Sequence, residues 1–234
     1  MSVPARARAP RAGAFPRWSV HAGEATLVRR QAVTLLALLL ALDVLLIAAD
    51  VFRHRGVLDD VRFAITRERG FGELLQYAKF AGLIFLLLTA ASRPRVAPLW
   101  ALVFAVLLLD DSNALHERLG LALASRLALP AIGPLRPVDF GELIVFAGAT
   151  VAILVPLGLV LWRGDPASCA LTLALAPPLA LLGVFAAGAD FVHSLSRAHS
   201  FRYLTGLVDD GGEMVATSLL VAVGYFQTRR GPSA

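Results

Sequence analysis

Six long apolar segments constrain the fold of this chain more than any other feature. They occupy residues 31–51, 74–92, 97–115, 140–162, 171–192 and 210–228. An apolar helix of about 20 residues spans the roughly 30 Å hydrocarbon core of a membrane. Hydrophobic residues make up 57% of the chain and charged residues 17%, which is typical of a multi-pass membrane protein. We therefore predict an all-α fold, a polytopic bundle of six transmembrane helices.

The segments outside the spans predict the domain organisation and the orientation. Residues 1–30 are rich in Arg and Pro and lack hydrophobic periodicity, so we expect a disordered cytoplasmic tail. Residues 31–228 form the expected transmembrane domain, and residues 229–234 a short C-terminal tail. Six spans place both termini on one side, and the arginines of both tails favour the cytoplasmic side of a bacterial inner membrane. A cleaved signal peptide is the alternative for the first segment, which is too long for one and contains Asp43.

Charge and cysteine content exclude several classes of function. The formal net charge of +5 comes almost wholly from arginine, and no basic stripe is interleaved with aromatic residues. We therefore expect membrane lipid, and no nucleic acid, as a partner. The single cysteine, Cys169, excludes an internal disulfide and a cysteine-rich metal site. Phosphate-binding loops, dinucleotide-binding glycine motifs and nucleophile elbows are absent from the sequence.

A short pattern recurs along the chain. The second, fourth and sixth apolar segments begin with Gly–Glu, in FGELLQYAKFAG, FGELIVFAGAT and GGEMVATSLLV, and the glutamates recur at intervals of 69 and 71 residues. Each odd segment ends with an Asp that a His follows within about a turn. These pairs are Asp50 with His54, Asp111 with His116, and Asp190 with His193. The pattern predicts three copies of a two-helix hairpin.

The alternation of spans brings these polar groups to one face of the membrane, which we expect to be the outer face. Odd spans end there and even spans begin there, so the acids and imidazoles converge. Asp110, Asn113 and Glu117 have the i, i+3, i+7 spacing of one helical stripe. Residues 57–69 and 119–129 contain enough apolar residues to lie as amphipathic helices on the membrane surface and cover a site.

Local structural roles account for some of these acids. Asp139 with Glu142, and Asp210 with Glu213, have capping-box spacing at a predicted helix start, so they are either caps or site residues. Acids at a helix C-terminus oppose the helix dipole, so those at the ends of the odd spans require compensation by loop arginines or by a metal ion. The acids are Asp50, Asp110, Asp111, Glu117 and Asp190, and the nearby arginines are Arg53, Arg118, Arg197 and Arg202.

Carboxylates and imidazoles without a thiolate suit a divalent zinc, iron or manganese ion. The predicted metal ligands are His116, His193, Asp111, Asp190, Glu213, Asp110, Asp210 and His54. A metal lowers the pKa of a bound water, so Glu117 or Glu142 is the expected general base. Ser112 is the one serine within the acidic cluster and is therefore the candidate nucleophile.

The motifs DDSNALHE (residues 110–117), VDFGEL (138–143) and DDGGEM (209–214) resemble a family of uncharacterised bacterial six-span membrane proteins. The similarity covers most of the chain after the N-terminal tail and implies no activity. The acidic and histidine cluster is also remotely similar to the alkaline ceramidase type of intramembrane metal hydrolase. That resemblance implies a zinc site of Ser112, Asp111, His116 and His193. The chain departs from that family's pattern because it lacks a His-x-x-x-His pair on one helix.

Three functions follow from these observations. The first is a metal-dependent membrane enzyme that acts on a lipid or other amphiphile at the outer face, hydrolytically or, with redox-active iron, oxidatively. The second is a proton- or metal-coupled transporter, which requires polar groups deep in the membrane, where the sequence places only Asp43 and Lys79. The third is a scaffold or assembly factor without chemistry, in which arginines hold the acidic rim.

Overall fold

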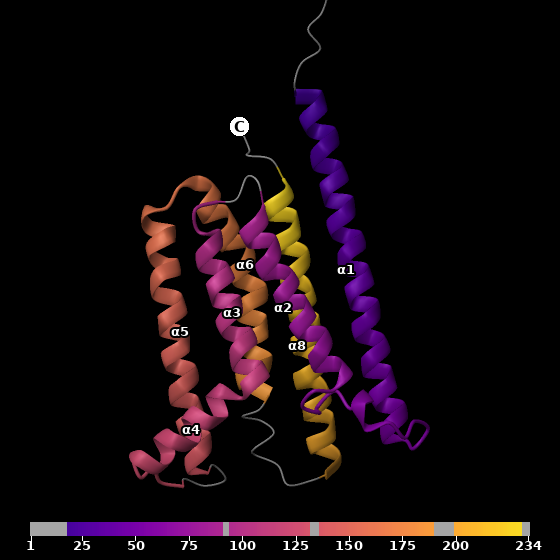
Figure 1. Ribbon diagram of the computed structural model, residues 1–234, viewed down its shortest axis with the longest axis vertical. Coiled ribbons are helices and arrows are strands. Elements are labelled where there is room, and N and C mark those ends of the chain that lie inside the picture. Colours follow the sequence, from indigo (N-terminus) through magenta and orange to yellow (C-terminus); the bar gives the residue numbers. More distant parts are fainter. Residues whose placement is uncertain (1–17, 91–93, 132–135, 190–198, 231–234) are drawn as a thin grey trace, which may run out of the picture.

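The computed structural model describes residues 18–90, 94–131, 136–189 and 199–230, with side chains described for these residues except 18–22, 187–189, 199–200 and 202. This part of the chain contains helices and no strands, as predicted (Figure 1). The elements are α1 (Trp18–His54), the short η1 (Val61–Phe63), α2 (Phe71–Thr89), α3 (Ala97–Asn113), α4 (Leu115–Arg126), α5 (Pro137–Arg163), α6 (Pro166–Gly183), the π-helix η2 (Val184–Ala189) and α8 (His199–Arg229).

Several helices have the length and composition of membrane spans. Four of them, α1, α2, α5 and α6, are long and apolar enough to cross a membrane, and the bent pair α3 and α4 makes a fifth if it counts as one span. These helices coincide with the first five apolar segments of the sequence. The prediction of a helical membrane protein is thus confirmed at this level.

Helices α1 and α8 begin more than ten residues before the apolar segments indicated. Helix α1 starts at Trp18, so residues 18–30, expected in the disordered tail, are helical, and residues 1–17 lie outside the described part. Good helix formers such as Ala, Glu and Leu follow Pro16, and no further proline interrupts this stretch. Helix α8 starts at His199, which makes helical part of the link expected before residue 210.

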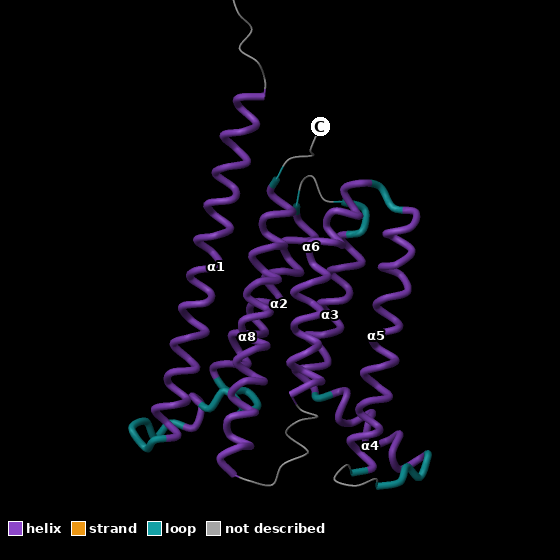
Figure 2. Tube along the Cα trace, turned by 180° about the vertical axis from the view of Figure 1, so that it is seen from behind, coloured by secondary structure: helices purple, strands orange, loops and turns teal. Residues whose placement is uncertain are grey.

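The core of the bundle lies between α2, α3, α6 and α8. Leu83, Trp100, Phe104, Leu175 and Leu220 are fully buried there. Helix α8 packs against α1, α2 and α6, whereas α5 contacts α4 and α6 at the opposite side of the bundle. Helix α1 leans away from the other helices along part of its length (Figure 1), and the view from behind shows the same arrangement (Figure 2).

A left-handed residue separates α3 from α4. Ala114 has φ 47° and ψ 48°, and the two helices meet at an angle of 73°. An alanine in this conformation is unfavourable by roughly 1–2 kcal/mol, so surrounding contacts must hold the bend. Helix α4 confirms the helix expected within residues 119–129, whereas residues 57–69 contain only the three-residue η1.

Close backbone contact joins α4 to the start of α5. A Cβ atom at Gly141 would lie 2.0 Å from the carbonyl oxygen of Gly120, and one at Gly120 would lie 2.8 Å from the nitrogen of Glu142. Only glycine at both positions permits this approach. Gly141, the glycine of the second FGEL motif, therefore allows α4 to pack across the first turn of α5 at this end of the bundle.

Candidate functional site

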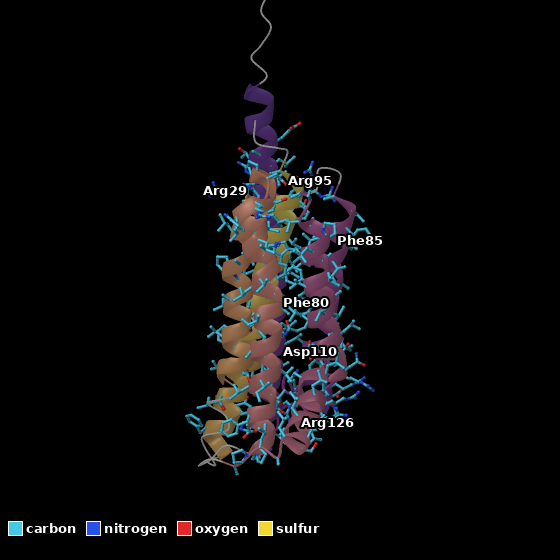
Figure 3. All side chains as sticks on the ribbon, turned by 90° about the vertical axis from the view of Figure 1, so that its left-hand side faces the viewer. Arg29, Phe80, Phe85, Arg95, Asp110 and Arg126 are labelled. Carbon is cyan, nitrogen blue, oxygen red and sulfur yellow. The ribbon has the colours of Figure 1, made fainter. Side chains whose placement is uncertain are left out.

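The polar groups gather at one end of the bundle, called here the acidic end. It comprises the α3–α4 bend, the first turns of α2 and α5, and residues 209–213 of α8. The end of α8 lies at the opposite end of the bundle, and the start of α1 projects beyond it (Figure 1). Asp110 and Arg126 mark the acidic side in Figure 3, whereas Arg29 and Arg95 lie toward the other end. The predicted convergence on one face is thus seen for the described residues.

The DDSNALHE motif forms the bend, and Asp110 is its central group. One Asp110 carboxylate oxygen, Oδ1, accepts the backbone N–H of His116 at 2.7 Å, and Oδ2 lies 3.1 Å from His116 Nδ1. The carboxylate therefore satisfies an orphan donor in the first turn of α4 and orients the imidazole. Phe146 of α5 lies beside the ring, with the centroids 5.1 Å apart.

This geometry corrects the predicted stripe of Asp110, Asn113 and Glu117. The i, i+7 relationship requires one continuous helix, but Ala114 ends α3 and turns the chain. Glu117 consequently lies on α4 and is exposed. The bend also removes the need for a metal ion to compensate Asp110, because the N-terminus of α4 favours a carboxylate.

A large cavity of about 1140 Å³ extends from the acidic end into the bundle between α3, α5, α6 and α8. Its deep part is lined by apolar side chains, among them Trp100, Ile153, Leu157 and Leu179. Its polar end is lined by predicted site residues: Asp110, Asp111, His116, Glu117, Glu142, Asp210 and Glu213. One continuous space thus joins an apolar compartment to a carboxylate- and imidazole-rich one.

A smaller cavity, called here the polar cavity, lies on the other side of the same carboxylates. It measures about 410 Å³ and lies between residues 65–69, the first turns of α2, the α3–α4 bend and α8. Asp111, His116, Asp210 and Glu213 line both cavities. Ser112 lines only the polar cavity, and its hydroxyl donates to the Leu109 carbonyl at 3.4 Å. That contact gives Ser112 no activating base.

Two acids near the site are local caps. Asp139 accepts the backbone N–H of Arg136 at 2.6 Å and pairs with its guanidinium at 2.7 Å, so it closes the start of α5. Glu73 accepts the backbone N–H of Arg69 and the hydroxyl of Tyr77. Asp210 and Glu213, in contrast, lie inside α8, so the capping alternative does not apply to them.

Asp50 and His54 lie apart from the two cavities. Asp50 is buried, and it accepts Arg53 Nη2 at 3.1 Å and the hydroxyl of Tyr203 at 3.2 Å. His54 stacks on the Tyr203 ring with a centroid separation of 3.7 Å. Arg53, which lies in the last turn of α1 and not in a loop, therefore compensates the acid at the end of this helix. Compensation by an arginine was one of the two alternatives that the sequence left open.

The deepest ionisable groups, Asp43 and Lys79, form a buried ion pair whose hydrogen bonds are completed by neighbouring groups. Lys79 binds Asp43 Oδ1 and donates to the Met214 carbonyl at 2.9 Å, and Ser218 donates to Asp43 Oδ2 at 2.6 Å. Both charged side chains are almost fully buried. The pair joins α1, α2 and α8 in the middle of the bundle, where it has a structural role.

The expected metal ligands are only partly described. Asp190 and His193 lie outside the described residues, and His54 is directed elsewhere. Among the His, Cys, Asp and Glu residues that the structure describes, no group of three is placed to hold one metal ion.

Gln76 is a site residue that the sequence analysis missed. It is buried on α2, lines the polar cavity, and donates from Nε2 to Glu213 Oε2 at 3.3 Å. The available signal was a lone amide in an apolar helix, one turn after Glu73 and therefore on the same face.

Comparison with known proteins identifies a family without an assigned activity. No curated protein and no solved structure matches the chain. A family model described as a domain of unknown function, DUF8692, matches residues 32–227 and so includes both cavities. The chain belongs to the DUF8692 family.

Proposed function

We propose that this protein is a membrane hydrolase whose substrate is an amphiphile held between α3, α5 and α6. The observation that carries the proposal is the large cavity, in which an apolar compartment is continuous with a polar one. Its volume of about 1140 Å³ slightly exceeds the roughly 300–1,000 Å³ of ordinary small-molecule sites. An acyl chain fits the compartment of Trp100, Ile153 and Leu157, and its polar head then meets the carboxylates of the acidic end.

The imidazole of His116 is the general acid–base group of this proposal. Asp110 binds Nδ1 and holds the ring, so Nε2 is available to take a proton from a water that attacks the acyl carbonyl of an ester or amide at the polar head. As the acyl–oxygen or acyl–nitrogen bond breaks, the imidazole returns this proton to the leaving alcohol or amine. The tautomer with hydrogen on Nδ1 follows from this contact with a carboxylate. Glu142, which lines the same polar end, is the second acid–base group.

A metal-dependent form of the reaction belongs to the same proposal. Zinc, iron or manganese would supply a water of lowered pKa, with His116, Asp111, Asp210 and Glu213 as ligands together with Asp190 and His193. Elemental analysis of the detergent-purified protein tests this form, with the His116→Ala, His193→Ala double variant as comparison. Stoichiometric metal that disappears in a folded double variant supports it. If the parent holds no metal after reconstitution with each ion, only the metal-free form of the reaction, carried out by His116 and the carboxylates, remains.

Filling the large cavity tests whether it holds the amphiphile. Gly183 lines the cavity and a Cβ atom there meets no atom within 4 Å, so Gly183→Phe places a ring in the space without a backbone clash. Gly158→Phe on α5 is the matched control, because Gly158 also has open space but does not line the cavity. Lipids that copurify are extracted and identified by mass spectrometry.

We expect one amphiphile class to copurify with the parent and Gly158→Phe, and to fall at least tenfold in Gly183→Phe. Turnover is then followed with palmitoyl p-nitroanilide and p-nitrophenyl palmitate as probes. His116→Asn keeps a donor for Asp110 but removes Nε2, so it should retain the bound lipid and lose turnover. Equal lipid content in both glycine variants would contradict the binding site.

The proposed topology has six spans with both termini in the cytoplasm. Helix α8, at 31 residues, exceeds the length needed to cross the hydrocarbon core. It carries polar groups such as Glu213 and Ser218, but α1, α2 and α6 pack around it and reduce its contact with lipid. The hairpin repeat is supported by the Gly–Glu pairs: Gly72, Gly141 and Gly212 pack against Ile65, Gly120 and Phe185, respectively, each in the segment that precedes its helix.

A further inference from the structure

The polar cavity differs from the large cavity in what surrounds it. Its arginines, Arg67, Arg69 and Arg118, are exposed, whereas Asp111, Asp210 and Glu213 are half-buried at its inner wall. Within the described part of the chain, neither Asp111 nor Asp210 forms an ion pair with a basic side chain. The inner wall therefore presents carboxyl oxygens that can accept hydrogen bonds, away from bulk water.

A buried oxygen at the same wall adds independent evidence. Gln76 is 6% exposed, and its Oε1 atom is buried with no hydrogen-bond partner among the described residues. A buried acceptor without a donor costs about 1–3 kcal/mol. The carboxamide nitrogen is already used, because it donates to Glu213. A ligand that brings N–H donors would complete this wall.

Among the described residues, the acceptors of the polar cavity suit an organic cation better than a metal ion. A metal requires three or four ligand atoms at about 2 Å, and no three His, Cys, Asp or Glu groups among the described residues converge in that way. A volume of about 410 Å³ suits a small organic molecule. An ammonium group donates three hydrogen bonds at ordinary lengths of about 2.8 Å and so reaches acceptors that are further apart.

We propose that the polar cavity is a binding site for a small primary ammonium ion, held by Asp111, Asp210, Glu213 and the Oε1 atom of Gln76. The site is separate from the apolar compartment and does not depend on the proposed hydrolysis. Because the two cavities share carboxylates, an ammonium ion bound here lies next to the polar head of a molecule in the large cavity.

Binding of defined probes to the full-length protein in nanodiscs tests the proposal by isothermal titration calorimetry. The probes are putrescine, its uncharged analogue 1,4-butanediol, tetramethylammonium, which has charge but no N–H donor, and zinc. We expect one putrescine per chain and at least tenfold weaker binding of both other organic probes. Equal affinity for tetramethylammonium would overturn the role of the acceptors, and tighter, competitive zinc binding would reassign the site to a metal.

Substitutions then locate the site. Gln76→Leu and Asp111→Asn should each weaken putrescine binding at least tenfold. Glu68→Gln removes a charge from an exposed residue at the same cavity and should change the affinity less than twofold. Tryptophan fluorescence and size-exclusion chromatography confirm folding of each variant. Gly183→Phe should leave putrescine binding intact, so failure of the lipid proposal is distinguishable from failure of this one. Unchanged binding in both Gln76→Leu and Asp111→Asn, or none in the parent, would overturn the proposal.

Discussion

The Asp43–Lys79 pair in the middle of the bundle and the carboxylates of the acidic end are both ionisable groups within an apolar helix bundle, but they are compensated differently. Asp43 and Lys79 neutralise each other, and Ser218 and the Met214 carbonyl complete their hydrogen bonds. Asp111 and Asp210 line two cavities and have no such partner among the described residues. A saturated buried pair indicates a structural role, whereas acceptors left facing a cavity indicate a site for a ligand.

The largest expected effect comes from breaking the central pair. Lys79→Met leaves the Asp43 carboxylate buried without its cation, so we expect a loss of about 3–5 kcal/mol in the free energy of unfolding. Reversible unfolding in mixed micelles, followed by tryptophan fluorescence, measures it. The double variant Asp43→Asn, Lys79→Met removes both charges and should recover most of the loss. If the double variant is no more stable than Lys79→Met, the cost of the single substitution does not come from the unpaired charge of Asp43.

The next effect tests whether the acidic end is shaped by backbone packing. Gly141→Ala places a Cβ atom 2.0 Å from the Gly120 carbonyl oxygen, so α4 must move away from α5. We expect a destabilisation of about 1–3 kcal/mol, the usual range for overpacking, measured by the same unfolding assay. Gly148→Ala on the same helix meets no atom within 4 Å and should change stability by less than about 1 kcal/mol. Equal effects of the two substitutions would show that α4 is not held by this contact.

Asp110 is a carboxylate of the acidic end that caps the first turn of α4, so its substitution should have a smaller effect. Asp110→Ala removes the acceptor of the His116 backbone N–H and should cost about 1 kcal/mol, as for the loss of a helix cap. Asp110→Asn keeps an oxygen acceptor and should cost less. Hydrogen exchange at the first turn of α4 reports the change locally. Unchanged protection there in Asp110→Ala would argue that Ala114 holds the bend without this cap.

The lengths of the apolar segments correctly predicted where helices occur, but not where each helix begins and ends. The first five apolar segments correspond to helices because a span buries its own backbone hydrogen bonds, whatever its neighbours are. The α3–α4 bend was missed because Ala114 adopts a left-handed conformation without the glycine that normally signals it. The start of α8 was missed because residues before 210 contain charged and polar side chains that hydropathy treats as a loop.

The candidate site was predicted as a set of residues rather than as a geometry. Helix alternation correctly placed Asp110, Asp111, His116 and Glu142 at one end, because it depends only on the number of crossings. Pairwise contacts depend on tertiary packing, which no spacing rule contains. His54 therefore stacks on Tyr203, a residue 149 positions later. Gln76 of α2 likewise donates a hydrogen bond to Glu213 of the neighbouring α8.

The Asp60–Arg62 pair at η1 is exposed to water, unlike the buried Asp43–Lys79 pair. Its substitution should have the smallest effect on stability. The Arg62 guanidinium and backbone N–H lower the pKa of the Asp60 carboxyl from 3.8 to about 2. A lowered pKa in the folded state stabilises the fold above pH 3.8, and this contribution disappears as the pH falls from 3.8 toward 2. The change in stability between pH 7 and 5 should therefore be the same in Arg62→Gln as in the parent, because Asp60 stays charged in both over this range, although the variant lacks the small stabilisation from the pair. The carboxyl ¹³C shift of Asp60 should titrate near pH 2 in the parent and at a higher pH, still below 3.8, in Arg62→Gln, which keeps the backbone N–H bond to the carboxyl. If Asp60 in the parent titrates near 3.8, solvent screens the Asp60–Arg62 pair. The strong effect expected for the Asp43–Lys79 pair would then depend on its burial.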